Sequence, residues 1–380
     1  MSFEREYAID PDRAALQNAA RGERRRQTVL QNGSGQSELS IQSRNFQRSG
    51  WRSAVAAALT VCILWPTGAD AQTSSDDGIL TMQFENDLFG NSDGHFTHGT
   101  RLAWMAPENR VPEWVTDAAS YVPLFDETAS KRVVFSLGQN IYTPDDITAR
   151  NPDTNDRPYA GWTYIGVGLV SVDGDQLDNL QLDIGIVGPY SLAEDVQKAW
   201  HEWFGFARPE GWDSQLRNEP GFVLTYERKW RQWKRFGLIG LDGDLTPHAG
   251  ASVGNVLTQA ATGFTIRLGN DLARNYDYGP PRIRPSLPGS DFFVLGGGFS
   301  WYVFAGIEAR GVLRNIFLDG NTFRDSASVD KKPFVGDIQA GVAFIIGPAR
   351  VSYTHTWRSR EFETQDDTDQ FGALSLSLAF

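Results

Sequence analysis

The amino-acid sequence predicts an all-β fold, a transmembrane antiparallel β-barrel of about twelve strands with a short helix in an extracellular loop. Three observations predict this class. Apolar and polar residues alternate with a period of two in many segments, the last segment, 374–380, alternates and ends on Phe380, and an export signal precedes the first alternating segment. Strands of a bacterial outer-membrane barrel alternate in this way because one face meets lipid and the other meets the lumen.

Acidic residues within the alternating segments favour a barrel over a β-sandwich. In 180–186, Leu and Ile occupy one face while Gln181 and Asp183 occupy the other, and Glu227 repeats this pattern in 222–227. A carboxylate does not suit a dry sandwich core, but it suits the wet lumen of a transmembrane barrel. The candidate strands are 79–88, 97–106, 132–142, 162–172, 178–188, 219–231, 236–249, 255–269, 298–311, 333–346, 349–359 and 370–380.

An even number of strands places both ends of the barrel chain on the periplasmic side. The loops that face outward are then 89–96, 143–161, 189–218, 250–254, 312–332 and 360–369. On the periplasmic side, the connections 173–177, 232–235 and 347–348 are short, as expected for turns, whereas 107–131 and 270–297 are longer than this rule expects.

The N-terminal part of the chain predicts export. Residues 1–50 are polar and lack apolar periodicity, so we expect them to be disordered or to reflect an over-extended start. Residues 51–71 have the pattern of a signal peptide, in which Ala69-Asp70-Ala71 provides a cleavage site before Gln72. We therefore expect residues 72–380 to form a barrel in a bacterial outer membrane after export to the periplasm.

Composition excludes several classes of function. The single cysteine, Cys62, lies in the signal segment, so the exported chain has no thiol for a disulfide, for Cys-bound zinc or for a Cys nucleophile. The formal net charge of −12 argues against nucleic acid as a partner. No apolar run after the signal is long enough for a spanning helix, so a membrane role requires a barrel.

The loop 189–218 predicts a helix. Ser191 followed by Glu194 has the spacing of a capping box, and the residues that follow, 192–204, have helical periodicity. The predicted apolar stripe consists of Val196, Ala199, Trp200, Trp203 and Phe204. Gly205 ends the helix, and His201 lies at the edge of the stripe.

Polar clusters gather on the outward end of the predicted barrel. They are Asn86-Asp87, Thr97-His98, Gln139 to Pro144, Asp156 to Trp162, His201, Gly211 to Leu216 and Asn218 to Pro220. In the first strand, Leu80, Met82 and Phe84 share one face, and polar Asn86 then falls on that same face. A local break of this kind indicates a functional site, because such inconsistencies concentrate there.

In their order along the chain, these clusters resemble the lipid A 3-O-deacylase family of LpxR-like outer-membrane enzymes, over about residues 79–380. The resemblance implies a twelve-stranded barrel that acts as a monomer on lipid A of lipopolysaccharide in the outer leaflet. It also implies calcium-dependent hydrolysis of the ester of the 3′-O-linked acyloxyacyl chain. By position, His201 corresponds to the family's general base, and Asn86 and Asp87 correspond to the pair that binds calcium. Thr97 corresponds to a hydroxyl in the catalytic site, and the resemblance also assigns Asn86 to that site.

These residue types suit the implied chemistry. The ordinary pKa of histidine lies near a neutral working pH, as a general base requires. Ester hydrolysis also needs positive charge where the oxyanion develops, and oxygen ligands from Asp and Asn suit calcium. One departure from the family concerns the stretch 145–150, where some members carry Lys. Here Arg150 is the cation expected to contact substrate, and Asp145 and Asp146 lie beside it.

Other interpretations of these residues remain open at this point. Asn86-Asp87 would also suit an Asx turn that ends a strand, and Thr97 an ordinary hydroxyl at a strand start. His201 alone would suit a helix face toward lipid headgroups. We expect His95 and His98 to be solvated loop residues, and Asp156-Arg157 to be an ion pair that orders a loop.

Two other functions compete with lipid A deacylation. An outer-membrane phospholipase would need a Ser nucleophile with His, and no Ser stands beside His201 in an obvious motif. A non-enzymatic small barrel or pore is compatible with the alternation alone, and only the polar clusters argue against it.

Overall fold

The computed structural model describes residues 77–87, 95–111, 129–272 and 298–380, together with residues 113, 115, 117, 125, 287, 292 and 293. The expectations for the segment 1–50 and for the signal peptide at 51–71 lie outside these residues. The unit described below lies within the compact part of the chain that runs from Asp70 to Phe380.

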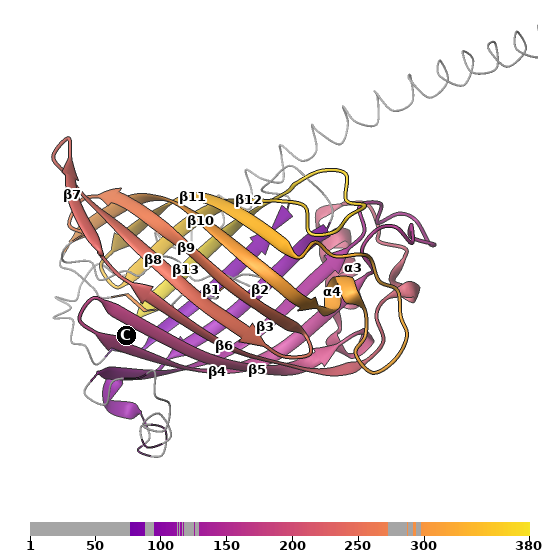
Figure 1. Ribbon diagram of the computed structural model, residues 1–380, viewed down its shortest axis with the longest axis horizontal. Helices are drawn as coiled ribbons and strands as arrows, with labels where there is room; N and C mark the ends of the chain where they lie inside the picture. The colour runs from indigo at the N-terminus through magenta and orange to yellow at the C-terminus, as the bar shows by residue number, and fades with distance from the viewer. Residues whose placement is uncertain are drawn as a thin grey trace, which may run out of the picture. The chain divides into compact units, whose positions relative to one another are not determined.

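This unit is a closed antiparallel barrel of twelve strands (Figure 1). The strands are β1 Ile79–Asn86, β2 His95–Met105, β3 Ser130–Thr143, β4 Ala160–Asp173, β5 Gln176–Val187, β6 Glu219–Trp230, β8 Leu241–Val253, β9 Leu257–Gly269, β10 Phe299–Asn315, β11 Phe334–Ile346, β12 Ala349–Arg358 and β13 Asp369–Ala379. Each strand pairs with its neighbour in the chain, and β1 closes the ring with β13. The predicted fold class is confirmed.

A short extra strand, β7 Lys234–Leu238, corrects the predicted strand 236–249. β7 and the start of β8 form a hairpin, whose turn residues Ile239 and Gly240 have φ of 54° and 77°. The ring itself closes through β6 and β8, which pair over Leu224–Lys229 and His248–Val253. The hairpin is therefore an extension beyond the ring. The predicted strand 236–249 was wrong because the left-handed turn at Ile239 and Gly240 divides this segment between β7 and β8.

The two faces of the barrel wall differ as the alternation predicts. On β1, Thr81, Gln83 and Glu85 are buried toward the lumen, whereas Met82 on the outer face is 55% exposed. Exposed apolar side chains recur on the outer face of other strands, for example Ile165 and Ile184, which is the surface that a lipid bilayer would cover. Among the described residues, no helix is long and apolar enough to cross a membrane.

The lumen is lined by charged side chains that pair across strands. Asp337 receives hydrogen bonds from Arg310 at 2.8 Å and from Arg358 at 2.9 Å, and Arg267 pairs with Asp244. Pairing of this kind offsets the high cost of burying a charge. Asp183 and Glu227 face inward as predicted, and both are fully buried.

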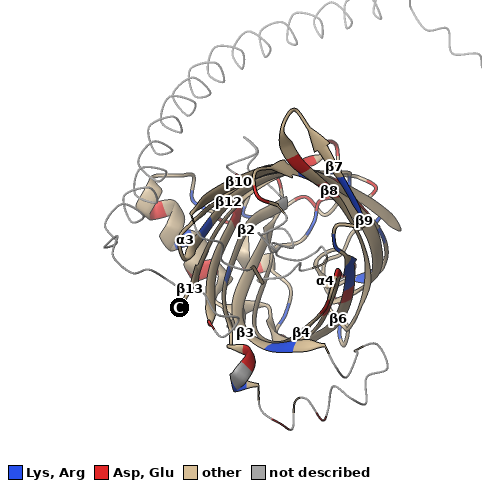
Figure 2. Cartoon of the chain, turned by 90° about the vertical axis from the view of Figure 1, so that its left-hand side faces the viewer, with Lys and Arg blue, Asp and Glu red and all other residues tan. Residues whose placement is uncertain are grey.

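A single helical turn, α4 Ile316–Asp319, follows β10 and packs inside the barrel near one end. Ile316 and Phe317 are buried in an apolar cluster that also contains Phe96, Tyr142 and Trp162, and the rings of Phe317 and Tyr142 stack with centroids 4.0 Å apart. Figure 2, which looks along the barrel, shows α4 inside the ring of strands and α3 outside it. The sequence predicts a loop over 312–332, and α4 is a helical turn within it that was not predicted.

Candidate active site

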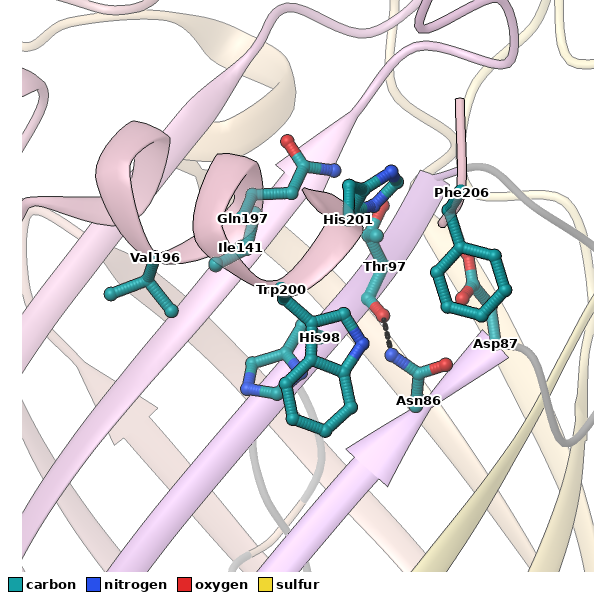
Figure 3. Close-up of a pocket in the computed structure, with 10 residues that line it drawn as sticks. All are labelled: Asn86, Asp87, Thr97, His98, Ile141, Val196, Gln197, Trp200, His201 and Phe206. Carbon is teal, nitrogen blue, oxygen red and sulfur yellow. Dashed lines mark hydrogen bonds between the residues drawn. The ribbon is translucent and has the colours of Figure 1, made fainter. Parts of the chain in front are cut away.

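A pocket lies between the helix α3 Ala193–Phe204 and the outer wall formed by β1, β2 and β3 (Figure 3). The pocket is open to solvent, and its enclosed volume is small, about 20 Å³. The residues that line it are Asn86, Asp87, Thr97, His98, Ile141, Val196, Gln197, Trp200, His201 and Phe206. The structure thus brings together the four residues predicted for catalysis and metal binding, three of them from the end of β1 and the start of β2 and the fourth, His201, from the distant helix α3.

The helix α3 is held against the barrel wall by a close contact at Gly161 on β4. A Cβ atom at this glycine would lie 2.1 Å from the Cβ of Ala193 and 2.3 Å from the Oγ of Ser191. Next to this contact, Ile141, Tyr159, Ala193 and Trp212 form a buried apolar cluster. The start of α3 is therefore fixed on the outside of β3 and β4, which sets the depth of the pocket.

The face that α3 turns toward the wall differs from the predicted one. Ala193, Gln197 and His201 are buried, whereas Trp203 from the predicted apolar stripe is 80% exposed. His201 therefore belongs to the buried stripe itself, whereas the prediction placed it at the edge of an apolar stripe. The contact of Ala193 with Gly161 fixes the rotation of α3 about its axis, and Gln197 and His201 lie on the same face as Ala193 because they follow it at intervals of four residues.

The predicted capping box at Ser191 and Glu194 is also wrong. The N-cap is Leu192, with φ of 58° and no side-chain cap, and the carboxylate of Glu194 instead accepts hydrogen bonds from Lys198 and Gln215. The predicted helix end is correct, because Gly205 follows Phe204 in the left-handed conformation with φ of 72°.

A β-bulge in β2 places two consecutive side chains on the pocket side of the wall. The pairing of β2 with β3 shifts between Phe96 and His98, which leaves Thr97 as the extra residue. Phe96 belongs to the buried lumenal cluster, while Thr97 and His98 both line the pocket. Bulges re-aim side chains in this way and occur often beside active sites.

Asn86 and Asp87 form the polar floor of the pocket at the end of β1. The side-chain amide of Asn86 donates to the backbone carbonyl of Thr97 at 2.7 Å, so the amide oxygen points away from β2, toward the Asp87 side (Figure 3). Both residues are buried, with exposed fractions of 3% and 2%. They lie on the lipid-facing side of the wall, where the break in the alternation of β1 predicted a site.

The side chains of Asn86 and Asp87 could bind a calcium ion, because a carboxylate and an amide oxygen are ligands that calcium prefers. Within the described ranges, no group of three or more His, Cys, Asp or Glu side chains could hold a metal ion. A calcium ion here would therefore rely on Asp87, the amide oxygen of Asn86 and other oxygen ligands.

The imidazole ring of His201 is held in one orientation by a hydrogen bond. Its Nδ1 lies 2.5 Å from the backbone oxygen of Ala207, and because a carbonyl oxygen can only accept, Nδ1 carries the proton of the neutral ring. The other nitrogen, Nε2, then holds a lone pair and can accept a proton. The imidazole is 5% exposed, which argues against a role as a residue that faces lipid headgroups.

His98 differs from its expectation as a solvated loop residue. It belongs to β2, is 8% exposed and lines the pocket. Its ring lies edge-on to Phe84, with centroids 4.8 Å apart, and its Nε2 is 2.7 Å from the hydroxyl oxygen of Thr100. The bulge at Thr97 explains the difference, and no sequence pattern signals it. The side chain of His95 is not described.

Arg150 lies outside the set of residues that line the pocket. Its side chain is 83% exposed, and its Nε is 3.6 Å from Glu210. The predicted pair Asp156-Arg157 also differs from expectation, because the guanidinium of Arg157 is fully buried and 3.5 Å from Glu361. The carboxylate of Asp156 accepts from the backbone N–H groups of Asp145 and Arg157, so it does order the loop.

The barrel and its wall pocket define an outer-membrane β-barrel protein with a polar site on the lipid-facing surface. A family model described as outer membrane protein LpxR matches residues 54–380. The chain belongs to this family, which is the lipid A deacylase family that its motifs resemble. Among curated protein sequences, none matches the chain.

Solved structures agree with this assignment at the level of the fold. The chain is similar to LpxR from Salmonella typhimurium, with 22% identity and a TM-score of 0.65, over 80% of this chain and 100% of that one. The β domain of the Bordetella autotransporter BrkA is less similar, with 10% identity and a TM-score of 0.37, over 80% and 97% of the two chains. Only the first of these likenesses supports the twelve-stranded fold.

Proposed function

We propose that this outer-membrane protein is a calcium-dependent esterase that removes the 3′-O-linked acyloxyacyl chain of lipid A. The observation that carries the proposal is the pocket on the outer wall, in which the lone pair of His201 and the oxygens of Asn86 and Asp87 line the same space. The substrate would be lipid A in the outer leaflet, which borders this wall, and the protein would act as a monomer after export by its signal peptide.

In the proposed reaction, His201 Nε2 takes a proton from a water molecule as the water oxygen attacks the ester carbon. The carbonyl of Ala207 holds the Nδ1–H and so stabilises the imidazolium that forms. The imidazolium then returns the proton to the leaving sugar oxygen, which yields a free fatty acid and a hydroxyl. A calcium ion held by Asp87 and Asn86 supplies positive charge for the oxyanion when bound.

Thr97 has a supporting role in this proposal. Its hydroxyl is 2.7 Å from that of Thr143, and its carbonyl fixes the amide of Asn86. We infer that Thr97 keeps the Asn86 oxygen aimed toward the calcium position. Arg150 stays a candidate contact for the phosphates or sugar acids of lipopolysaccharide, at the surface away from the pocket lining.

Mass spectrometry of lipid A tests the proposed function. Cells that make the protein should show lipid A without the 3′ acyloxyacyl chain, while cells without the protein should keep it. An unchanged acyl pattern in the presence of calcium would refute the proposal. Release of fatty acid from phospholipid vesicles instead would identify a phospholipase.

The contact at Gly161 provides a test of how α3 positions His201. Replacing Gly161 with alanine should push α3 away from β4, because the new Cβ would overlap Ala193 and Ser191. A displacement near 1 Å at a catalytic group costs about 100-fold in rate, so we expect a loss of about that size in deacylation. The matched control is Gly168→Ala on the same strand, where the nearest atom to a new Cβ lies at 3.6 Å. Equal activity in both variants would contradict this role of α3.

A further inference from the structure

Two nitrogen donors on α3, one amide NH₂ and one indole N–H, are buried at the pocket and have no hydrogen-bond partner within the part of the chain that the structure describes. They are Nε2 of Gln197 and Nε1 of Trp200, and both residues line the pocket with His201. Gln197 is 3% exposed. Buried donors in proteins are nearly always paired, so these two groups point to a ligand that brings acceptor atoms into the pocket.

The orientation of the Gln197 amide follows from its neighbour Trp212. The indole Nε1 of Trp212 lies 2.7 Å from Oε1 of Gln197. An indole N–H can only donate, so the oxygen of the amide must face Trp212 and the NH₂ group must face the other way. Figure 3 shows this nitrogen on the His201 side of the side chain. Gln197 precedes His201 by four residues, so both lie on the same face of α3.

The Trp200 indole is held by aromatic contacts from the barrel and the helix. Its ring centroid lies 5.4 Å from that of Phe84 on β1 and 5.8 Å from that of His98 on β2. Phe204, one turn further along α3, packs on it at 4.5 Å. These contacts fix the plane of the ring, and Figure 3 shows its nitrogen on the edge that faces Asn86.

The two walls of the pocket therefore differ in hydrogen-bonding character. The β1 wall presents the carboxylate of Asp87 and the amide oxygen of Asn86, which attract a cation. The α3 wall presents N–H donors from Gln197 and Trp200, which attract neutral or negative oxygen atoms. An acyl ester is a ligand with such oxygens, and the apolar side chains of Val196 and Phe206 beside the donors suit its hydrocarbon chain.

We propose that Gln197 and Trp200 form an ester-binding subsite, whose two N–H groups hold acyl oxygen atoms of the bound lipid. This inference rests on the proposed function, since the ligand is the acyl ester that His201 is proposed to hydrolyse. The two residues act in binding: they hold the substrate in the ground state, while His201 handles the proton.

Conservative substitutions can remove the N–H donors of Gln197 and Trp200 while they keep the packing of the two side chains. Gln197→Glu keeps an acceptor for Trp212 and removes both N–H groups. Trp200→Phe keeps an aromatic ring against Phe84 and His98 and removes the indole N–H. The matched control is Trp203→Phe, a change of the same type on the same helix at a side chain that is 80% exposed.

The experiment measures equilibrium binding of lipid A to each variant in detergent micelles, in a His201→Ala background in which turnover is slowed by about 10²-fold or more. We expect binding to weaken about 3- to 10-fold for Trp200→Phe, as for one lost hydrogen bond. We expect a loss of at least about 10-fold for Gln197→Glu, where a carboxylate faces the ester oxygens. Trp203→Phe should bind like the parent, and kcat/KM of the His201-containing versions should fall by the same factors.

A coupling measurement adds an independent test. Trp212→Phe frees the Gln197 amide to rotate, so it should weaken binding, but it should add little to Gln197→Glu because the donor is already lost. Binding by Gln197→Glu and Trp200→Phe equal to that of Trp203→Phe would overturn the subsite. Absence of acyl release by the unmodified protein would instead refute the proposed function, and the binding comparison would still decide about the subsite.

Discussion

Replacing His201 with alanine should lower the rate of acyl release from lipid A by about 10²- to 10⁴-fold, the usual contribution of a general base. The physical reason is that Nε2 of His201 is the atom in the pocket whose lone pair is fixed by the hydrogen bond from Nδ1–H to Ala207. The measurement is release of fatty acid from purified lipid A in micelles, with calcium present. The barrel should still fold, because the side chain makes no contact with the lumenal core.

The control for this variant is a histidine at the same level of the wall but outside the pocket. His355 on β12 pairs with Gly372, which in turn pairs with Asn86 on β1, so it lies two strands from the site. His355→Ala should retain full activity. Heat-modifiable migration of both variants on gels would show that each barrel has formed. Near-normal activity of His201→Ala in a folded barrel would refute the assignment of the base.

Replacing Asp87 with asparagine should remove the response of the protein to calcium. The carboxylate is the charged oxygen donor of the pair at the end of β1, and loss of stabilisation of the oxyanion costs about 10²- to 10³-fold in rate. In the unmodified protein, a chelator should abolish activity, and calcium should restore it. Calcium should also raise the thermal unfolding temperature, because an ion that binds the folded state stabilises it.

The control for Asp87→Asn is Asp195→Asn, which makes the same change of charge on an exposed residue of α3. Asp195→Asn should keep both the activity and the calcium-dependent rise in unfolding temperature. A calcium-dependent rise that persists in Asp87→Asn would show that the ion binds elsewhere, and the metal assignment would fail.

Much of the fold follows from local patterns in the sequence. A period of two along each strand predicts the twelve barrel strands, because the lipid and the lumen select opposite side chains over the whole wall. The failures occur where one residue breaks the local rule. The turn at Ile239-Gly240 creates the β7 hairpin within a segment that still alternates, and α4 has too few residues for any helical period to appear.

The candidate site was predictable only in part. The break in alternation at Asn86 is visible in the sequence, and the resemblance to the deacylase family adds His201, but the roles of both residues remain proposals. The inward position of His201 was not predicted because the buried face of α3 consists of Ala193, Gln197 and His201, and two of these three side chains are polar, so no apolar period marks that face. The position of His98 in the pocket depends on the one-residue bulge in β2. A shift of one residue moves each following side chain to the opposite face of a strand. No pattern in the sequence marks Gln197 or Trp200 as residues of the pocket.

The pocket lies on the outside of the barrel, while α4 and its aromatic neighbours form a buried apolar cluster inside it. If the proposed reaction occurs there, enzyme and substrate meet by lateral diffusion within one leaflet, and the fatty acid leaves into the same leaflet. The rate at which enzyme and substrate meet is then set by diffusion in two dimensions, within the membrane surface. The concentration that governs the rate is the fraction of lipid molecules at the surface that are lipid A, and dilution of the bulk solution leaves it unchanged.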